Sequence, residues 1–255
     1  MKLVVVAALL LAANTLSAQT TQAYLAAGDS ARSANRMTDA LALYEKAVQL
    51  DSLDRQALSL ASLVAVTLGE FNSNPGERDS LFARATRYAR QAVATDVDDA
   101  QAHFLLARAL GRTALSQGMR ERVRFAVEVR NEANAALALK PNHAGARHVL
   151  GLWHQNVMQL SRLQRFAART LLGGKVLGEA SWAEAQRNLE ASVALEPNAI
   201  THRLDLRRFF AVRKQYDQAR EQLQWVLAAP SVDYNDDAYR HEADVALKAM
   251  RNVLQ

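Results

Sequence analysis

A short segment that recurs four times along the 255-residue chain is the feature that most constrains its fold. The copies read AVQLDS, AVATDV, ALALKP and SVALEP, at residues 47–52, 92–97, 136–141 and 192–197. Each copy ends a stretch with apolar residues at helical spacing, and another such stretch begins within a few residues. A helical hairpin of this kind cannot bury its apolar face without its neighbours. The pattern therefore predicts stacked hairpins, an architecture more typical of binding surfaces than of catalysts.

The composition agrees with an all-α chain. Half of the residues are hydrophobic but only 6% are aromatic, and four prolines and ten glycines leave few breaks in the helical pattern. The formal net charge is +5, and the basic residues are spread along the predicted helices. Because a nucleic-acid footprint more often shows clustered Lys and Arg with exposed aromatics, no nucleic-acid binding is expected. The chain has no cysteine, which excludes disulfides and thiolate metal sites.

Residues 1–18 have the pattern of a secretory signal peptide. Lys2 precedes eleven apolar residues, 3–13, and a small-residue site follows. The apolar run is shorter than the roughly 20 residues that span a membrane. We expect cleavage after Ala18, with an uncleaved anchor as the alternative because Leu16 is bulkier than usual at its position. The pattern predicts a bacterial protein that is periplasmic or secreted, with the repeat domain in residues 19–255.

Residues 21–54 match the tetratricopeptide repeat, whose period is about 34 residues. Gly28 is small where the two helices of the first hairpin are predicted to cross closely. Tyr24 and Tyr44 are large and are predicted to fill the gap to the adjacent hairpin. The turn at residues 35–38 offers Asn35 or Thr38 as a helix cap.

Four further hairpins follow from the apolar periodicity. Their helices are predicted at 54–70 and 78–95, 99–115 and 120–139, 144–157 and 182–195, and 200–212 and 218–227. The segment 71–76 contains Asn-Pro-Gly and is interpreted as a breaker. A long excursion, 158–180, separates the two helices of the fourth hairpin, and residues 234–254 read as an amphipathic capping helix. The prediction is an all-α tetratricopeptide-like solenoid of about five helical hairpins with a C-terminal capping helix.

Three segments of the C-terminal three-fifths share features with a known family. The first comprises residues 109–112, 118–123, 131–132 and 135–141. The second comprises residues 148–153, 160–161 and 171–173. The third comprises residues 183–185, 195–197, 229–231 and 233–243. On these residues the chain from Ala102 onwards resembles the regulator of microtubule dynamics family, a tetratricopeptide-like group. The most specific part is the Leu-Gly-x-Trp sequence of residues 150–153, together with the excursion after it.

The resemblance implies a repeat fold and a binding role. The family's animal members are associated with microtubules and organelle membranes, and microtubule binding is implied by the family name alone. Here a signal peptide stands in place of the membrane anchor, and an exported bacterial protein would meet no microtubule. The expected partner is a protein or peptide.

Sequence motifs for catalysis are lacking. The chain contains no Gly-x-Ser-x-Gly, His-Glu-x-x-His or phosphate-loop motif, and Gly173-Gly174-Lys175 is interpreted as a turn. His148 and His154 lie six residues apart, about 120° round a helix, whereas two ligands of one metal prefer a spacing of three or four. We therefore predict a non-enzymatic chain without a metal or cofactor.

A peptide-binding groove is the sharper hypothesis. In the tetratricopeptide fold the first helix of each hairpin lines the inner groove, and the register selects seven candidates. These are Arg32, Arg108, Arg112, His148, Gln155, Asn156 and Arg208. Four arginines on one surface can hold an acidic peptide or a C-terminal carboxylate by paired hydrogen bonds. The alternative, that they pair with Asp and Glu of neighbouring hairpins, stays open at this point.

The excursion offers a second surface. Its apolar stripe consists of Leu160, Leu163, Phe166 and Ala167, and beside it stand Arg162, Arg165 and Arg169. Packing of this stripe into the groove or against the next hairpin is the favoured interpretation, and contact with a membrane surface or a partner is the other. The predicted function is a protein- or peptide-binding scaffold or adaptor. The alternative is an envelope-associated structural protein that touches a membrane through residues 158–180.

Overall fold

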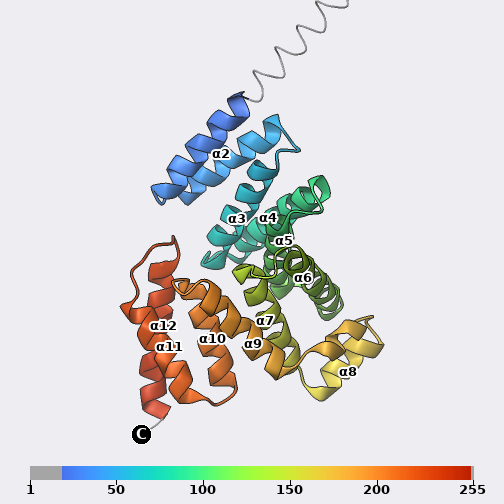
Figure 1. The fold of residues 1–255 in the computed structure, drawn as a ribbon, viewed down its shortest axis with the longest axis vertical. Coiled ribbons are helices and arrows are strands. Elements are labelled where there is room, and N and C mark those ends of the chain that lie inside the picture. The colour runs from blue at the N-terminus through green and yellow to red at the C-terminus, as the bar shows by residue number, and fades with distance from the viewer. Residues whose placement is uncertain (1–18, 254–255) are drawn as a thin grey trace, which may run out of the picture. The chain divides into compact units, whose positions relative to one another are not determined.

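The computed structural model describes residues 19–253, and every regular element in that range is a helix (Figure 1). The predicted signal peptide, 1–18, lies outside the described residues. The chain divides into two compact units, Met1–Val97 and Asp98–Gln255. No helix in the described part of the chain is both long enough and apolar enough to cross a bilayer.

The first unit consists of two helical hairpins. A helix over 19–33 contacts α2 (Met37–Leu50), and α3 (Arg55–Glu70) packs on α4 (Pro75–Thr95). Helix α2 also packs on α3, which joins the two hairpins. The predicted close crossing at Gly28 is confirmed, because a Cβ there would lie 2.4 Å from the ring of the fully buried Tyr44. Tyr24 is only partly buried, and Leu25 occupies the core in its place.

The turn of the first hairpin is closed by the backbone. Asn35 takes a left-handed conformation, φ 57°, which asparagine tolerates better than most residues. This conformation lets the N–H of Arg36 donate to the carbonyl of Ala31 at 2.9 Å. Arg36 is then the residue before α2, and no side chain caps the helix. The prediction that Asn35 or Thr38 caps α2 is therefore wrong.

Helix α4 begins earlier than the sequence predicts. The side chain of Asn74 accepts hydrogen bonds from the N–H groups of Gly76 at 3.0 Å and Glu77 at 3.3 Å, and Pro75 is the first helical residue. Proline is tolerated there because its missing N–H would have no partner in the helix. The Asn-Pro-Gly sequence starts a helix, which corrects its interpretation as a breaker.

The second unit contains three hairpins and one further helix. The hairpins are α5 (Ala100–Thr113) with α6 (Met119–Leu139), α7 (Ala144–Gln159) with α9 (Trp182–Leu195), and α10 (Ile200–Val212) with α11 (Tyr216–Ala228). The further helix is α12 (Asp236–Val253). Helices α5, α7, α10 and α12 form a row in which each contacts the next. The two hairpins of the first unit and the three of the second, followed by α12, confirm the predicted fold of five hairpins and a C-terminal helix.

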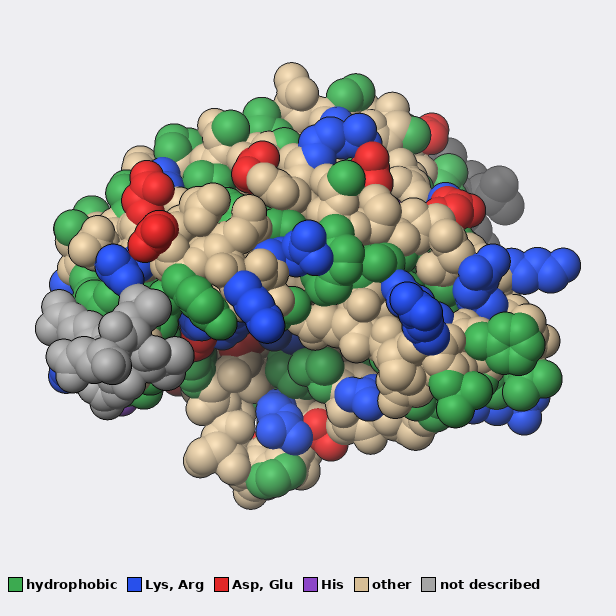
Figure 2. All heavy atoms as spheres, turned by 90° about the horizontal axis from the view of Figure 1, so that it is seen from below, with side chains coloured by type: hydrophobic (Ala, Val, Ile, Leu, Met, Phe, Trp, Pro, Cys, Tyr) green, Lys and Arg blue, Asp and Glu red, His purple; other side chains and the backbone are tan. Residues whose placement is uncertain are grey.

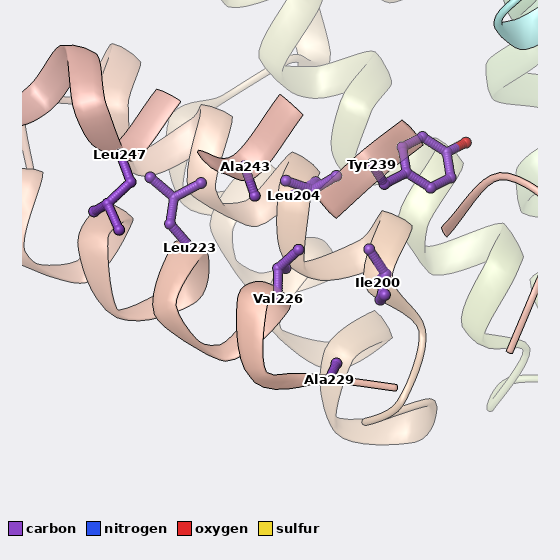
Figure 3. Close-up of a cluster of buried hydrophobic side chains, with 8 residues drawn as sticks. All are labelled: Ile200, Leu204, Leu223, Val226, Ala229, Tyr239, Ala243 and Leu247. Carbon is purple, nitrogen blue, oxygen red and sulfur yellow. The ribbon is translucent and has the colours of Figure 1, made fainter. Parts of the chain in front are cut away.

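Helix α12 caps the last hairpin through one apolar face. Tyr239, Ala243 and Leu247 are spaced four residues apart and are all buried. They pack on a cluster formed by Ile200 and Leu204 of α10 and Leu223, Val226 and Ala229 of α11 and its end, as Figure 3 shows. The capping role predicted for the tail is confirmed by this shared core.

The excursion between α7 and α9 forms its own small substructure. It contains α8 (Arg162–Thr170) and a 3-10 turn, η2 (Lys175–Glu179). Helix α8 packs on η2, with Ala168 as its buried residue, and η2 in turn contacts α6. Leu163 and Phe166 remain 76% and 62% exposed. The expectation that their stripe packs into the groove or on the next hairpin is therefore wrong, because a different side of α8 makes the contact.

Candidate functional site

A cluster of charged side chains and histidines along the row of first helices is the candidate site. This polar cluster consists of Arg108 and Arg112 of α5, His148 of α7, His202, Asp205, Arg207 and Arg208 of α10, and Glu242 of α12. Four of its members are predicted groove residues, and they come from three hairpins: Arg108 and Arg112 from α5, His148 from α7 and Arg208 from α10.

Asp205 is the buried centre of the polar cluster. The Nε2–H of His148 donates to its carboxylate at 2.8 Å, and Arg208 donates to its other oxygen. Burial alone would raise the pKa of Asp205, but the hydrogen bond from His148 and the positive charges of His148, Arg208 and Arg112 hold it below its usual range. Asp205 is therefore a buried carboxylate that stays ionised.

Arg208 links α10 to the capping helix. Its Nη2 atom lies 2.7 Å from each carboxylate oxygen of Glu242, and Arg207 reaches the same carboxylate at 3.0 Å. Burial tends to lower the pKa of Arg208, but Asp205 and Glu242 raise it above its usual range. The sequence left open whether Arg208 binds a partner or pairs with acidic residues of the chain. In the structure it pairs with Asp205 and Glu242.

His202 is a second buried histidine, and its ring centroid lies 4.5 Å from that of His148. Its Nδ1 atom lies 3.3 Å from the carbonyl of Ser192. A carbonyl only accepts, so Nδ1 carries the hydrogen. Burial, followed by the charge of His148, lowers the pKa of His202 to about 3. The ring is therefore neutral at ordinary pH.

Arg108 and Arg112 of α5 are close enough to α10 for their charges to act on its buried groups. The charge of Arg108 contributes to the lowered pKa of His202, and that of Arg112 to the lowered pKa of Asp205. Both side chains are partly buried. The polar cluster thus holds four arginines and two carboxylates, and Glu196 lies 3.9 Å from His202, so arginines outnumber carboxylates there. Such a surface favours an anionic ligand.

The remaining groove candidates have different surroundings. Gln155 is 5% exposed, and its Oε1 atom has no hydrogen-bond partner within residues 19–253. Asn156 is exposed, because it lies about 100° round the helix from the buried Gln155. Arg32 belongs to the first unit, where its Nη2 atom lies 3.9 Å from Asp29.

Four members of the polar cluster were not singled out by sequence reasoning: His202, Asp205, Arg207 and Glu242. The spacing of His202, Asp205 and Arg208, three residues apart on one helix, is a signal that links the first two to a predicted arginine. No sequence signal places Glu242, because the register of α12 against α10 depends on the loop that joins α11 to α12.

His154 lies apart from the polar cluster. Its Nδ1 atom accepts from the N–H of Ser181 at 3.4 Å, and its ring meets that of Trp153 edge-on. Burial lowers the pKa of His154. His148 and His154 therefore do not share a site, in line with their spacing. Across the described residues, no three His, Asp or Glu side chains gather as metal ligands, and the absence of a metal or cofactor stays a prediction.

Paired helices with a row of first helices are the architecture of tetratricopeptide-repeat proteins. The fold is similar to that of TTC0263, a thermophilic TPR protein of Thermus thermophilus, with a TM-score of 0.61 and 19% identity over 88% of this chain and 99% of that one. It is also similar to pilF of Pseudomonas aeruginosa, with a TM-score of 0.52 and 16% identity over 92% and 93% of the two chains. Both likenesses establish the fold alone.

The family follows from a match over most of the sequence. The model described as regulator of microtubule dynamics protein 1-3 matches residues 14–251, and the chain belongs to this family. It is 24% identical over 176 residues to regulator of microtubule dynamics protein 3 of Bos taurus. That alignment covers 69% of this chain but 37% of the bovine protein, so the chain spans little more than a third of that relative's length. The resemblance seen from Ala102 onwards is confirmed, and the match extends it through the first unit.

Proposed function

We propose that the chain is a non-enzymatic scaffold that binds an acidic protein or peptide along the first helices of its second unit. The observation that carries the proposal is the excess of arginines over carboxylates in the polar cluster of α5, α7, α10 and α12. Guanidinium groups bind carboxylates by paired hydrogen bonds, which are stronger than bonds between neutral groups. A helical-repeat fold supplies the extended surface that such a partner needs.

Arg108 and Arg112 are the proposed contacts with the partner. Arg208 joins Asp205 to Glu242 and so links α10 to the capping helix. Gln155 is a further candidate, since its buried Oε1 atom would gain a hydrogen bond from an N–H of the partner. The proposed contact surface is therefore limited to α5 and α7, whereas the seven candidates from the sequence lie on four of the five hairpins.

The location of the protein is part of the proposal. The signal-peptide pattern of residues 1–18 supports a periplasmic or secreted protein. The name of the family refers to microtubules, but an exported bacterial protein would not meet them. An acidic protein or peptide of the envelope is therefore the proposed partner.

The test measures anisotropy of a fluorescein-labelled hexaglutamate peptide with a free carboxyl terminus. The whole chain should bind it, and Arg108→Glu/Arg112→Glu should weaken binding about ten-fold or more because two attractive contacts become repulsive. Binding should also weaken as salt rises from about 0.05 to 0.5 M, since exposed charges are screened.

The matched control is Arg120→Glu/Arg187→Glu, which makes the same change in charge at exposed positions on the second helices α6 and α9. It should bind the peptide nearly as well as the unaltered chain. If both double variants lose binding equally, the peptide senses only overall charge, and the assignment to α5 fails. Co-purification from the native cell, repeated with the same variants, then identifies the natural partner.

A further inference from the structure

Three large apolar side chains of the excursion are exposed to solvent. Leu163 and Phe166 of α8 and Leu171 at its end are 76%, 62% and 76% exposed, among the most exposed large hydrophobic residues in the described chain. At about 100° per residue they lie within one arc of α8. Exposed apolar groups gathered on one side of a helix are costly in water and mark an interaction site.

The helix that carries them is well defined. Ser161 and Gln164 form a capping box at its start, with hydrogen bonds of 3.2 and 2.9 Å. At its end the N–H of Gly174 donates to the carbonyl of Ala168 at 2.9 Å, after Gly173 has turned the chain with φ 77°. The apolar arc is therefore presented by a formed helix, so its ordering adds no cost when it binds.

Basic side chains flank the arc on one side. Arg162, Arg165 and Arg169 fall within about 60° of one another around α8, directly beside Phe166. The excursion, residues 158–180, holds these three arginines, Lys175 and one acidic residue, Glu179, which pairs with Arg130 of α6. In Figure 2, apolar and basic side chains stand side by side at the right-hand edge, where α8 lies in Figure 1. This charge is complementary to an anionic surface.

The size of α8 distinguishes a lipid surface from a protein partner. A nine-residue helix is about 14 Å long and 10 Å wide. A stable protein–protein interface buries about 800 Å² per partner, far more than one face of such a helix provides. Shallow insertion into a lipid interface needs only a few apolar side chains with cations beside them.

We propose that α8 is a membrane-docking element that inserts Leu163, Phe166 and Leu171 into an anionic lipid surface. The neighbouring arginines and Lys175 contact the lipid phosphates. This inference goes beyond the proposed peptide-binding function, because α8 lies outside the polar cluster of α5, α7, α10 and α12. The scaffold would then be held at a membrane while its first helices bind a partner.

The experiment is co-sedimentation of the whole chain with vesicles of phosphatidylglycerol and, separately, of phosphatidylcholine, at about 0.15 M salt. We expect binding to the anionic vesicles and little to the neutral ones. Leu163→Asp/Phe166→Asp should lower the partition coefficient about ten-fold or more, because two inserted side chains become charged. Both positions are exposed, so the fold should survive, as circular dichroism would verify.

The matched control is Leu53→Asp/Val245→Asp, which adds the same charge at positions that are 65% and 53% exposed and lie outside α8. It should retain binding. The variant Phe166→Trp measures how deeply α8 inserts into the lipid. Brominated phosphatidylglycerol should quench the tryptophan fluorescence of this variant more strongly than that of the unaltered chain.

Three results would overturn the proposal. One is failure to bind either vesicle. Another is equal binding by the α8 variant and the control, which would indicate adhesion by charge alone. The third is a dimer, seen by analytical ultracentrifugation, that Leu163→Asp/Phe166→Asp dissociates, which would make a second copy of the chain the occupant. None of these results bears on peptide binding by Arg108 and Arg112, so the two proposals fail separately.

Discussion

At the scale of single residues, His202 and Asp205 are two buried titratable groups one helical turn apart on α10. Asp205 stays charged because His148, Arg208 and Arg112 surround it, whereas His202 stays neutral because burial and the charge of His148 oppose its protonation. Both arrangements disfavour the addition of a proton to the folded state. The polar cluster should therefore be destabilised by acid.

The pH dependence of His202 follows from its lowered pKa. The unfolded chain binds the proton near pH 6.5, but the folded chain does not bind it until about pH 3. The free energy of unfolding should therefore fall as pH decreases between these values, by about 1.4 kcal/mol per pH unit. From about pH 7 to 4.5, His202 should account for a loss of about 2 to 3 kcal/mol. Asp205 adds to the loss only near and below about pH 4, where the unfolded carboxyl takes up its proton.

Urea unfolding at pH 7 and 4.5 measures this effect. All three tryptophans, Trp153, Trp182 and Trp225, belong to the second unit, so their fluorescence reports its unfolding. His202→Leu should lose the predicted part of the pH dependence, whereas His241→Asn, at an exposed position of α12, should keep it. The same slope in all three chains would contradict a neutral, buried His202.

At the scale of secondary-structure elements, two identical Leu-Gly pairs have different surroundings. A Cβ on Gly151 of α7 would lie 2.8 Å from the side chain of Leu189 and 3.0 Å from its backbone nitrogen in α9. A Cβ on Gly111 of α5 would meet nothing within 4 Å. Gly151 thus allows the close approach of two helices, whereas Gly111 does not.

The same substitution should therefore act in opposite directions. Gly151→Ala should destabilise the second unit by about 1 to 2 kcal/mol, because overpacking outweighs the better helix propensity of alanine. Gly111→Ala should stabilise it by up to about 1 kcal/mol, since only the propensity changes. Urea unfolding followed by tryptophan fluorescence compares the two variants. Equal shifts would mean that the α7–α9 crossing tolerates the extra methyl group.

The helices themselves were well predicted by their apolar periodicity. The bounds of α9 and α10 agree with the sequence prediction, and those of the other helices differ by a few residues. The helix caps were harder to predict. An asparagine such as Asn35 can either cap a helix or form a left-handed turn, and the pair Asn74-Pro75 can either interrupt a helix or begin one. The exposure of Leu163 and Phe166 was not predictable, since periodicity shows that a helix has an apolar face but not what covers it.

The candidate site was predicted in part for the same reason. Register along one helix placed Arg108, Arg112, His148 and Arg208 on the row of first helices. Which of them pair with each other depends on distances between helices. Arg208 was therefore selected as a binding residue, although it bonds to Glu242 of α12.

At the scale of the whole molecule, the capping helix closes the end of the second unit. Ala243 is fully buried between α10 and α11, whereas Val245, two residues further on, is 53% exposed. Without α12, the apolar residues Leu204, Leu223 and Val226 would face water at the end of the stack. Terminal repeats of solenoids need such a polar cover for solubility.

Ala243→Asp should therefore detach α12 and lower the free energy of unfolding by about 3 kcal/mol or more, because it buries an unpaired charge. Val245→Asp makes the same chemical change on the exposed face and should shift stability by less than about 0.5 kcal/mol. Urea unfolding measures both, and light scattering should detect association of the Ala243→Asp chain. A soluble, equally stable Ala243→Asp chain would show that α12 is not needed as a cap.

The excursion also has a consequence for the order in which the second unit folds. Residues 160–181 separate α7 from α9, whereas 213–215 join α10 to α11 and 114–118 join α5 to α6. Closing the longer connection costs about 1 to 2 kcal/mol more chain entropy, before the local structure of α8 and η2 reduces it. Hairpins α5–α6 and α10–α11 can therefore form early and locally, and α7 with α9 would join them last. The centre of the unit, where His148 meets Asp205, would then be completed only after both of its flanks have folded.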